Sequence, residues 1–504
     1  MTRINEVVMK CKVIINQNKN PIYIGMIWFA IAFLGGLKLI YDNYGHITSL
    51  GTSISFFGKL LALLVAVLLA FLFIISLCVF IYRALTFDGK ERKIVIYATP
   101  FLVLLFSKLI VNLQWTSVAG YFVGDEKLIW DSAVKLYPFC FVYTSELFLV
   151  SFFVFPITLA PTILKIILYS FLFGYIIYRI NKYYSGNYGF VVYIFCIFEP
   201  FINYGLSVHR MFWYAPLYLF FTVKIYFDNK ERKKRSFALG TVVYMSLISA
   251  LLTVWRREGF YLLVVGFIII WIVYCKNKSS YNIKHVMILY YFCTALLLIP
   301  LLSVGAAEKS VTIRSYLVRM MYEDSFNEEA VKDELVVIDK YMNIEKIKKY
   351  NDENGIEGFA DCYYEWQGWK DGEYYVAKNN YLDVDEEEFT KAVLSIIIKE
   401  PIVFIKSRVR SFLVVSCVGY GYGFGGNMMI PFLFLFVILV YSLLKKDKIL
   451  LLLSLGVFSH TVITIGTMPA SYYKYFLEMV MYAYAFFVII NIDYLNKRQG
   501  DCIN

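Results

Sequence analysis

Long apolar segments alternate with short polar ones along almost the whole chain. Most apolar segments are about twenty residues long, which is the length an α-helix needs to cross the ~30 Å hydrocarbon core of a bilayer. The pattern predicts an all-α polytopic membrane protein with about twelve transmembrane helices. The expected spans cover residues 22–41, 55–83, 93–113, 163–180, 188–205, 212–227, 236–254, 259–275, 286–303, 428–444, 449–466 and 475–493.

Two further apolar segments are not expected to cross the membrane. A span over 139–161 would reverse the orientation of everything after it, so we expect helices that lie in or dip into the outer surface there. Segment 402–417 carries Lys406, Arg408 and Arg410, and it is expected to lie at the interface.

The uneven distribution of charge sets the expected orientation. The chain has a net charge of +11, yet residues 304–400 hold 22 acidic and 12 basic residues. The basic excess therefore falls in short segments between the apolar runs, such as 90–93, 228–235 and 445–448. All of them lie on one side if both termini are cytoplasmic, as the positive-inside rule requires. This charge indicates membrane orientation rather than binding to nucleic acid.

Composition agrees with an integral membrane protein and argues against a disulfide-rich or zinc-binding protein. The chain is 60% hydrophobic and 19% aromatic, with a mean hydropathy of +0.62, values typical of an integral membrane protein. The nine cysteines are scattered without a CxxC motif or a His/Cys cluster, so neither a disulfide framework nor a zinc site is expected. The first twenty residues are polar and basic, and no cleavable signal is expected.

Three regions are expected along the chain. Residues 1–303 form an N-terminal transmembrane region that includes a large outer loop at 114–162, with surface-lying helices. Residues 304–427 form a small extracytoplasmic acidic region between spans nine and ten, ending in a helix that returns to the membrane and stops near Pro401. Residues 428–504 form a C-terminal transmembrane region.

A conspicuous polar motif in the outer loop is GDEKLIWDSAVKL at 124–136. Two adjacent carboxylates, Asp125 and Glu126, follow the third expected span, and an amphipathic helix is predicted after them. Its apolar positions fall at i, i+4, i+7 and i+8 from Ile129 to Tyr137, so it would lie on the bilayer surface. The alternative is that Asp125 only caps this helix, because Asp is a favoured N-cap residue.

Cationic and aromatic residues recur at the expected outer ends of other spans, against the positive-inside trend. Arginine side chains match phosphate oxygens bidentately, so such residues can bind a lipid phosphate. The alternative is that they anchor headgroups by snorkelling, and that the tyrosines belong to an interfacial belt. The candidates are His209 and Arg210 in SVHRMFW, Arg256, Arg257 and Glu258 in WRREGF, and Tyr473 and Lys474 in SYYKYF.

These motifs resemble those of the GT-C glycosyltransferases, polytopic enzymes that include protein O-mannosyltransferases and aminoarabinose transferases of lipid A. The resemblance rests on Asp125, Glu126, Ile129 and Ala133 in the first outer loop, on WRREG midway, and on YYKYF near the last span. Two features depart from the family pattern. Two additional spans precede the carboxylate pair, and Lys474 replaces the usual final arginine.

The resemblance implies a function on the outer face of a bacterial cytoplasmic membrane. The enzyme would move a sugar from a polyprenyl-phosphate donor to a glycan, lipid or protein acceptor of the cell envelope, with inversion at the anomeric carbon. Asp125 would be the catalytic base, and Glu126 would bind the acceptor or a divalent cation. Arg210, Arg256, Arg257 and Lys474 would neutralise the donor phosphate, with His209, Glu258 and Tyr473 beside them. The acidic region would select the acceptor.

Two other functions remain open. A polysaccharide polymerase of the O-antigen or capsule type also joins lipid-linked sugars and has many spans, but its catalytic residues should lie in its large loops. A flippase or transporter of lipid-linked sugars suits twelve spans, but a transporter should show polar groups in mid-span. The main candidates here, Lys108 and Glu199, both lie toward the outer ends of their expected spans.

Overall fold

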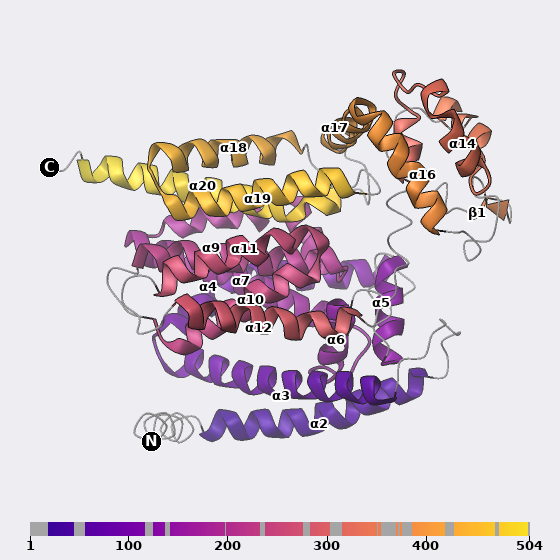
Figure 1. Cartoon of the computed structure of the whole chain (residues 1–504). Coiled ribbons are helices and arrows are strands. Elements are labelled where there is room, and N and C mark those ends of the chain that lie inside the picture. The colour runs from indigo at the N-terminus through magenta and orange to yellow at the C-terminus, as the bar shows by residue number, and fades with distance from the viewer. Residues whose placement is uncertain are drawn as a thin grey trace. The chain divides into compact units, whose positions relative to one another are not determined.

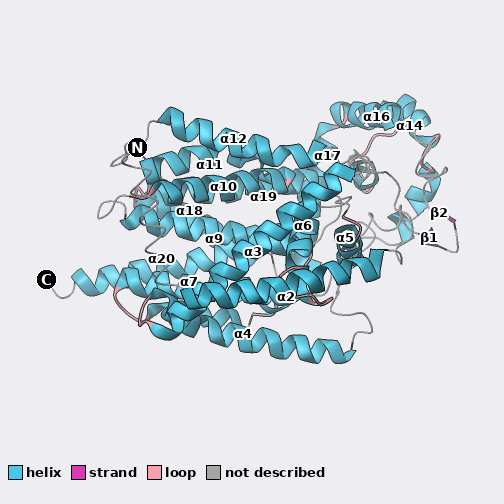
Figure 2. Cartoon of the chain, turned by 90° about the horizontal axis from the view of Figure 1, so that it is seen from below, coloured by secondary structure: helices cyan, strands magenta, loops and turns pink. Residues whose placement is uncertain are grey.

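The computed structural model is helical almost throughout the part of the chain that it describes (Figure 2). Within that part the strands form one short hairpin, in which β1 (Trp369–Lys370) pairs antiparallel with β2 (Glu373–Tyr374). The described residues are 19–44, 56–115, 124–136, 142–196, 198–231, 237–275, 283–302, 315–349, 351–353, 369–370, 373–374, 386–418, 428–468 and 473–501.

Seven helical segments of the described chain are long and apolar enough to cross a membrane. They are Lys19–Asn43, Gly58–Thr86, Lys90–Val111, Ala160–Tyr184, Glu258–Cys275, Lys448–Thr467 and Tyr473–Asn496. Four shorter apolar helices accompany them, at Val142–Phe152, Leu239–Trp255, Ile283–Leu298 and Met429–Leu444. The predicted class, an α-helical multi-pass membrane protein, is thereby confirmed.

The chain divides into two compact units, which we describe separately. Unit 1 comprises residues Met1–Arg257, Leu262–Val304 and Val488–Asn504, and unit 2 comprises Glu258–Tyr261 and Gly305–Phe487. Figure 1 labels most of the helices of both units.

Unit 1 is built from α-helices interrupted by short 3-10 and π segments. In chain order these are α2 (Lys19–Tyr44), α3 (Phe56–Thr86), α4 (Lys90–Trp115), α5 (Gly124–Val134), α6 (Val142–Phe152), α7 (Ala160–Tyr184), η1 (Tyr188–Cys196), α8 (Glu199–Leu206), α9 (Arg210–Glu231), α10 (Leu239–Trp255), α11 (Leu262–Ile270), η3 (Trp271–Cys275) and α12 (Ile283–Leu302). Helix η2 (Arg257–Tyr261) begins in unit 1 and continues in unit 2.

Helices α4 and α7 approach each other closely at Gly174. A Cβ atom at this position would lie 2.5 Å from the carbonyl oxygen of Ile94 and 2.9 Å from the Cβ of Ala98. Only a residue without a side chain fits there, because real Cβ atoms do not come so near to backbone atoms. Small residues at helix contacts of this kind are typical of membrane proteins.

The predicted span 188–205 is wrong as a single helix. The structure has the 3-10 helix η1, a non-helical Phe198, and then the eight-residue helix α8. Pro200 supplies the reason, since it lacks the N–H that would bond the carbonyl of Cys196 and continue a helix across this point. By contrast, α6 has 11 residues and is about 16 Å long, too short to cross a bilayer. This length agrees with a surface location for 139–161.

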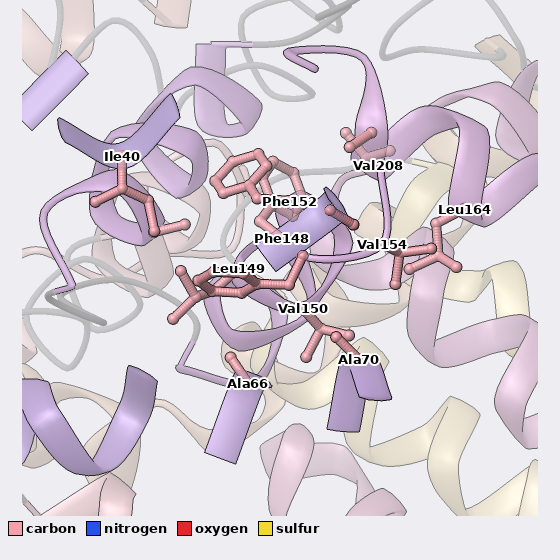
Figure 3. Packing of buried hydrophobic residues seen from close by; sticks show 14 of the residues in the cluster. Ile40, Ala66, Ala70, Phe148, Leu149, Val150, Phe152, Val154, Leu164 and Val208 are labelled. Carbon is pink, nitrogen blue, oxygen red and sulfur yellow. The ribbon is translucent and has the colours of Figure 1, made fainter. Parts of the chain in front are cut away.

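Helix α6 contributes to one hydrophobic cluster of unit 1. Phe148, Leu149 and Phe152 lie among Ala66 and Ala70 of α3, with all five side chains almost fully buried (Figure 3). The cluster also contains Ile129 of α5, Leu164 of α7, and Val208 from the turn between α8 and α9. This core therefore fixes the three segments that supply the site described below.

Unit 2 combines a small helical domain with apolar helices. Its elements are residues 315–320, η4 (Glu329–Val331), α14 (Lys332–Asp339), the hairpin, α16 (Glu386–Lys399), α17 (Pro401–Val418), α18 (Met429–Leu444), α19 (Lys448–Thr467), η5 (Tyr473–Phe476) and the first part of α20 (Leu477–Asp501). The small domain has its own core, where Leu317, Ile338, Phe389 and Val393 are buried. Helix α16 ends at Lys399 and α17 begins at Pro401, as the sequence predicted.

Candidate functional site

Helix α5 carries the carboxylate pair and packs against the core through its apolar face. Ile129 and Ala133 are buried while Lys127 is exposed, as the periodicity predicted. The helix ends at Val134, earlier than expected, because Leu136 adopts a positive φ of 53° that turns the chain away. Asp125 is the second residue of this helix, so it lies in the first turn rather than at the N-cap.

Glu126 is completely buried and joins α5 to the turn before α9. Its Oε1 accepts hydrogen bonds from the backbone N–H of Val208 at 2.9 Å and of His209 at 3.1 Å. The hydroxyl of Ser207 donates a further, short hydrogen bond to the same oxygen. Hydrogen bonds to a charged group each contribute about 1.5–3 kcal/mol, so this carboxylate fixes the two segments firmly to each other.

Lys165, on the second turn of α7, completes this buried cluster. Its side chain is 1% exposed, and its ammonium donates to the backbone carbonyl of Ser207. The negative charge of Glu126 is close enough to act on it. Its Nζ also lies 5.4 Å from the ring centroid of Phe212 and 5.7 Å from that of Trp213. The buried amine of Lys165 therefore faces the first turn of α9.

His209 and Arg210 begin α9. The Nδ1 atom of His209 accepts a 3.4 Å hydrogen bond from the backbone N–H of Met211, so this buried histidine caps the helix. That contact favours the structural interpretation of His209 over a direct role in binding substrate. Arg210 is the first residue of the helix and is half-buried.

Arg256 follows the last residue of α10 and packs against the second turn of α9. It is buried, and its Cζ lies 5.6 Å from the ring centroid of Tyr214. The rings of Tyr214 and Trp255 are 6.4 Å apart, and those of Trp255 and Tyr143 are 5.9 Å apart. Cations and aromatic rings thus gather at the positive end of the α9 helix dipole, where anions are stabilised.

Two further carboxyl groups have environments that alter their titration. Burial raises the pKa of Asp131 on α5, although Lys127 and Lys135 act in the opposite direction. Burial raises the pKa of Glu146 on α6 to about 8, so this carboxyl is protonated at neutral pH. Its Oε1 is buried without a hydrogen-bond partner among the described residues.

The other predicted site residues divide between the two units. Arg257 belongs to unit 1, and its side chain and that of Asp125 lie outside what the structure describes. Glu258, Tyr473 and Lys474 belong to unit 2. Tyr473 and Lys474 are buried in η5, with the Lys474 Nζ 5.7 Å from the ring centroid of Tyr475, and Glu258 is half-buried in η2.

The described residues contain no group of three or more His, Cys, Asp or Glu side chains arranged to bind a metal ion.

The sequence analysis did not single out Lys165, although it is a lone lysine within an apolar segment. A charged residue in such a segment is a functional candidate by default. It also did not single out Tyr143, because nothing in the sequence distinguishes this residue from other tyrosines near span ends.

No protein-family model, curated protein or solved structure matches this chain.

Proposed function

We propose that the protein is a GT-C-type glycosyltransferase that moves a sugar from a polyprenyl-phosphate donor to a cell-envelope acceptor. The observation that supports this most directly is the Glu126 contact with the turn at Ser207–His209. It joins the helical turn that carries Asp125 and Glu126 to the turn that precedes Arg210, although about eighty residues separate the two in sequence. This combination suits the reaction, in which a base activates the acceptor hydroxyl and cations stabilise a departing phosphate.

The chain's own residues take distinct roles in this proposal. Asp125 is the general base and accepts the proton of the acceptor hydroxyl. Glu126 positions it, because its buried hydrogen bonds fix the first turn of α5. Arg210 and Arg256, at the N-terminal end of α9, neutralise the charge that develops on the leaving phosphate. Arg257, the next residue along the chain, acts on the same phosphate, and the acidic region selects the acceptor.

The test is a transfer assay with purified protein and a panel of polyprenyl-phosphate sugars. The readout is the polyprenyl phosphate released, because this product is common to every donor. Asp125→Asn is expected to reduce release by a factor on the order of a hundred to ten thousand. Asp131→Asn on the same helix is the matched control, since it makes the same chemical change away from the proposed base.

Two outcomes would contradict the proposal. In the first, no donor of the panel is consumed above the level without protein. In the second, Asp125→Asn and wild type release polyprenyl phosphate at the same rate. Retained release without transfer to an acceptor would favour hydrolysis and remove the acceptor role of the acidic region.

A further inference from the structure

Helix α17 of unit 2 lies across the ends of three other helices. Phe412 on α17 packs against Phe432 in the first turn of α18, with ring centroids 5.4 Å apart, and against Phe476 just before α20, at 5.6 Å. The Nη1 of Arg408 donates a 3.2 Å hydrogen bond to the carbonyl oxygen of Met468, the residue that follows α19. These contacts place α17 at the common end of α18, α19 and α20. In Figure 1, α17 is seen almost end-on, whereas α18 and α19 run across the view.

This placement sets the level of α17 relative to a membrane. Helix α19 and the segment Tyr473–Asn496, which contains most of α20, are both long and apolar enough to cross a bilayer. A helix that lies across the ends of such spans runs along the membrane surface instead of crossing it. The 18 residues of α17 therefore form about 27 Å of helix in the plane of the interface.

One side of α17 is exposed and apolar. Ile402, Ile405, Val409 and Leu413 recur at three- and four-residue spacing and are 46–68% exposed. The spacing continues into the last turn of α16, where Ile398 is 78% exposed. We define these five residues as the apolar strip. Large apolar side chains that gather in one exposed row mark a surface that contacts lipid or another protein.

The two borders of the apolar strip have different surroundings. At about 100° per residue, Lys406 and Arg410 follow the strip around the helix on one side, and Phe412 borders it on the other. The ammonium of Lys406 donates to the hydroxyl of Ser325 at 3.4 Å, and the Nη1 of Arg410 lies 3.4 Å from a carboxylate oxygen of Glu323. Both partners follow residues 315–320 of the small helical domain. The strip therefore lies between that polar domain and the ends of the apolar helices.

The charge of α17 favours lipid over protein as the partner of the strip. Helix α17 has three basic and no acidic residues, whereas residues 304–400 hold 22 acidic and 12 basic ones. Long cationic side chains beside an apolar row are typical of helices at a membrane surface, where their charged ends reach the headgroups. An apolar row bordered by cations at the level where spans end matches the boundary between acyl chains and anionic headgroups.

We propose that the apolar strip inserts into the lipid surface and holds the small helical domain against the membrane, with Lys406 and Arg410 at the level of anionic headgroups. Val403, on another side of α17, is buried in the core of the small domain, so α17 connects that core directly to the lipid. This proposal does not depend on glycosyl transfer, and it concerns residues that the transfer assay does not use.

The experiment measures the depth of spin labels in the full-length protein, held as a single copy in nanodiscs of neutral lipid mixed with phosphatidylglycerol. Native cysteines are replaced, and a nitroxide is attached at Ile405→Cys or Val409→Cys. At both positions, collisions with oxygen, which dissolves in lipid, are expected to exceed those with a water-soluble nickel chelate, at a depth of ~5–10 Å. Val336→Cys on α14 is the matched control. Val336 is an exposed apolar residue outside the strip, at 61%, so collisions with nickel should exceed those with oxygen there.

The cation border has its own readout. A nitroxide at Arg410→Cys is expected at headgroup level, with a ratio of oxygen to nickel collisions between those of Val409→Cys and Val336→Cys. A label at Arg410→Cys as deep as that at Val409→Cys would overturn the assignment of this border to the headgroups.

Three results would overturn insertion of the strip into lipid. In the first, nickel collisions dominate at Ile405→Cys and Val409→Cys as they do at Val336→Cys, which means that the strip faces water. In the second, both reagents collide rarely in discs with one copy, which means that the same chain covers the strip. In the third, discs with two copies lose the oxygen collisions and show coupling between labels, which identifies a second copy as the partner.

Discussion

Glu126 gives the sharpest test of how this site is built. In Glu126→Ala, two buried backbone N–H groups and the hydroxyl of Ser207 lose their acceptor, and Lys165 loses the adjacent negative charge. An orphaned buried donor costs about 1–3 kcal/mol, and breaking a buried charge pair costs about 3–5 kcal/mol. These terms overlap, so we expect a loss of about 3–5 kcal/mol in the free energy holding α5 in place. Glu126→Gln retains an acceptor oxygen and is expected to lose about half as much.

The loss can be measured locally with a cysteine reporter. Ser132 on α5 is 2% exposed, so a thiol at Ser132→Cys reacts only when the helix opens. A loss of 3 kcal/mol corresponds to labelling faster by about a hundredfold. Reactive native cysteines must first be replaced so that only the reporter thiol is labelled. Lys127→Ala on the exposed face of the same helix is the control, and its opening free energy is expected to lie within about 0.5 kcal/mol of that of wild type.

The charge contribution separates in a double-mutant cycle. Glu126→Gln alone leaves the buried lysine without a counter-charge, but in the Lys165→Met background there is no lysine to be left so. We therefore expect the double variant to lose about 1–3 kcal/mol less of the free energy that holds α5 in place than the sum of the losses in the two single variants. If Glu126→Ala labels no faster than Lys127→Ala, the buried carboxylate does not hold α5. If the cycle shows no coupling, the two charges do not interact.

Two further predictions concern packing and pH. Gly174→Ala places a Cβ 2.5 Å from the carbonyl oxygen of Ile94 and should lower the thermal midpoint of unfolding strongly. Gly240→Ala is the control, because a Cβ there has nothing within 4 Å, and it should leave the midpoint unchanged or raise it. Equal effects of the two substitutions would contradict the close contact of α4 and α7. Glu146 has a folded-state pKa raised to about 8, so its contribution to stability is complete below the unfolded value near 4.5 and decreases as pH rises toward 8. Glu146→Gln should therefore be more stable than wild type at pH 8 but not at pH 4.5. The difference in free energy of unfolding between the two proteins should change by about 1.4 kcal/mol for each pH unit between these values. A difference that does not depend on pH would contradict burial of this carboxyl.

Local sequence determined the class of this protein and the identity of many helices. Apolar runs of about twenty residues predict spans because each such helix satisfies its own backbone hydrogen bonds in lipid. The amphipathic pattern of 124–136 predicted which side of α5 is buried, and Ile129 and Ala133 lie there. Pro401 marked the boundary of α16 and α17 because proline cannot continue a helix. Pro200 carries the same signal, and the segment 188–205 is not one continuous helix although its hydropathy predicts one.

Only the tertiary structure decided which distant groups meet. Periodicity shows that a helix has a buried face, but it does not show which segment covers that face. The sequence suggested that Glu126 binds the acceptor or a divalent cation. In the structure it is buried and accepts hydrogen bonds from the N–H groups of Val208 and His209, some eighty residues away. Lys165 likewise contacts the backbone carbonyl of Ser207, 42 residues away in sequence. Side-chain bonds to the backbone of a distant segment leave no pattern in sequence, because every residue offers the same carbonyl and most offer the same N–H.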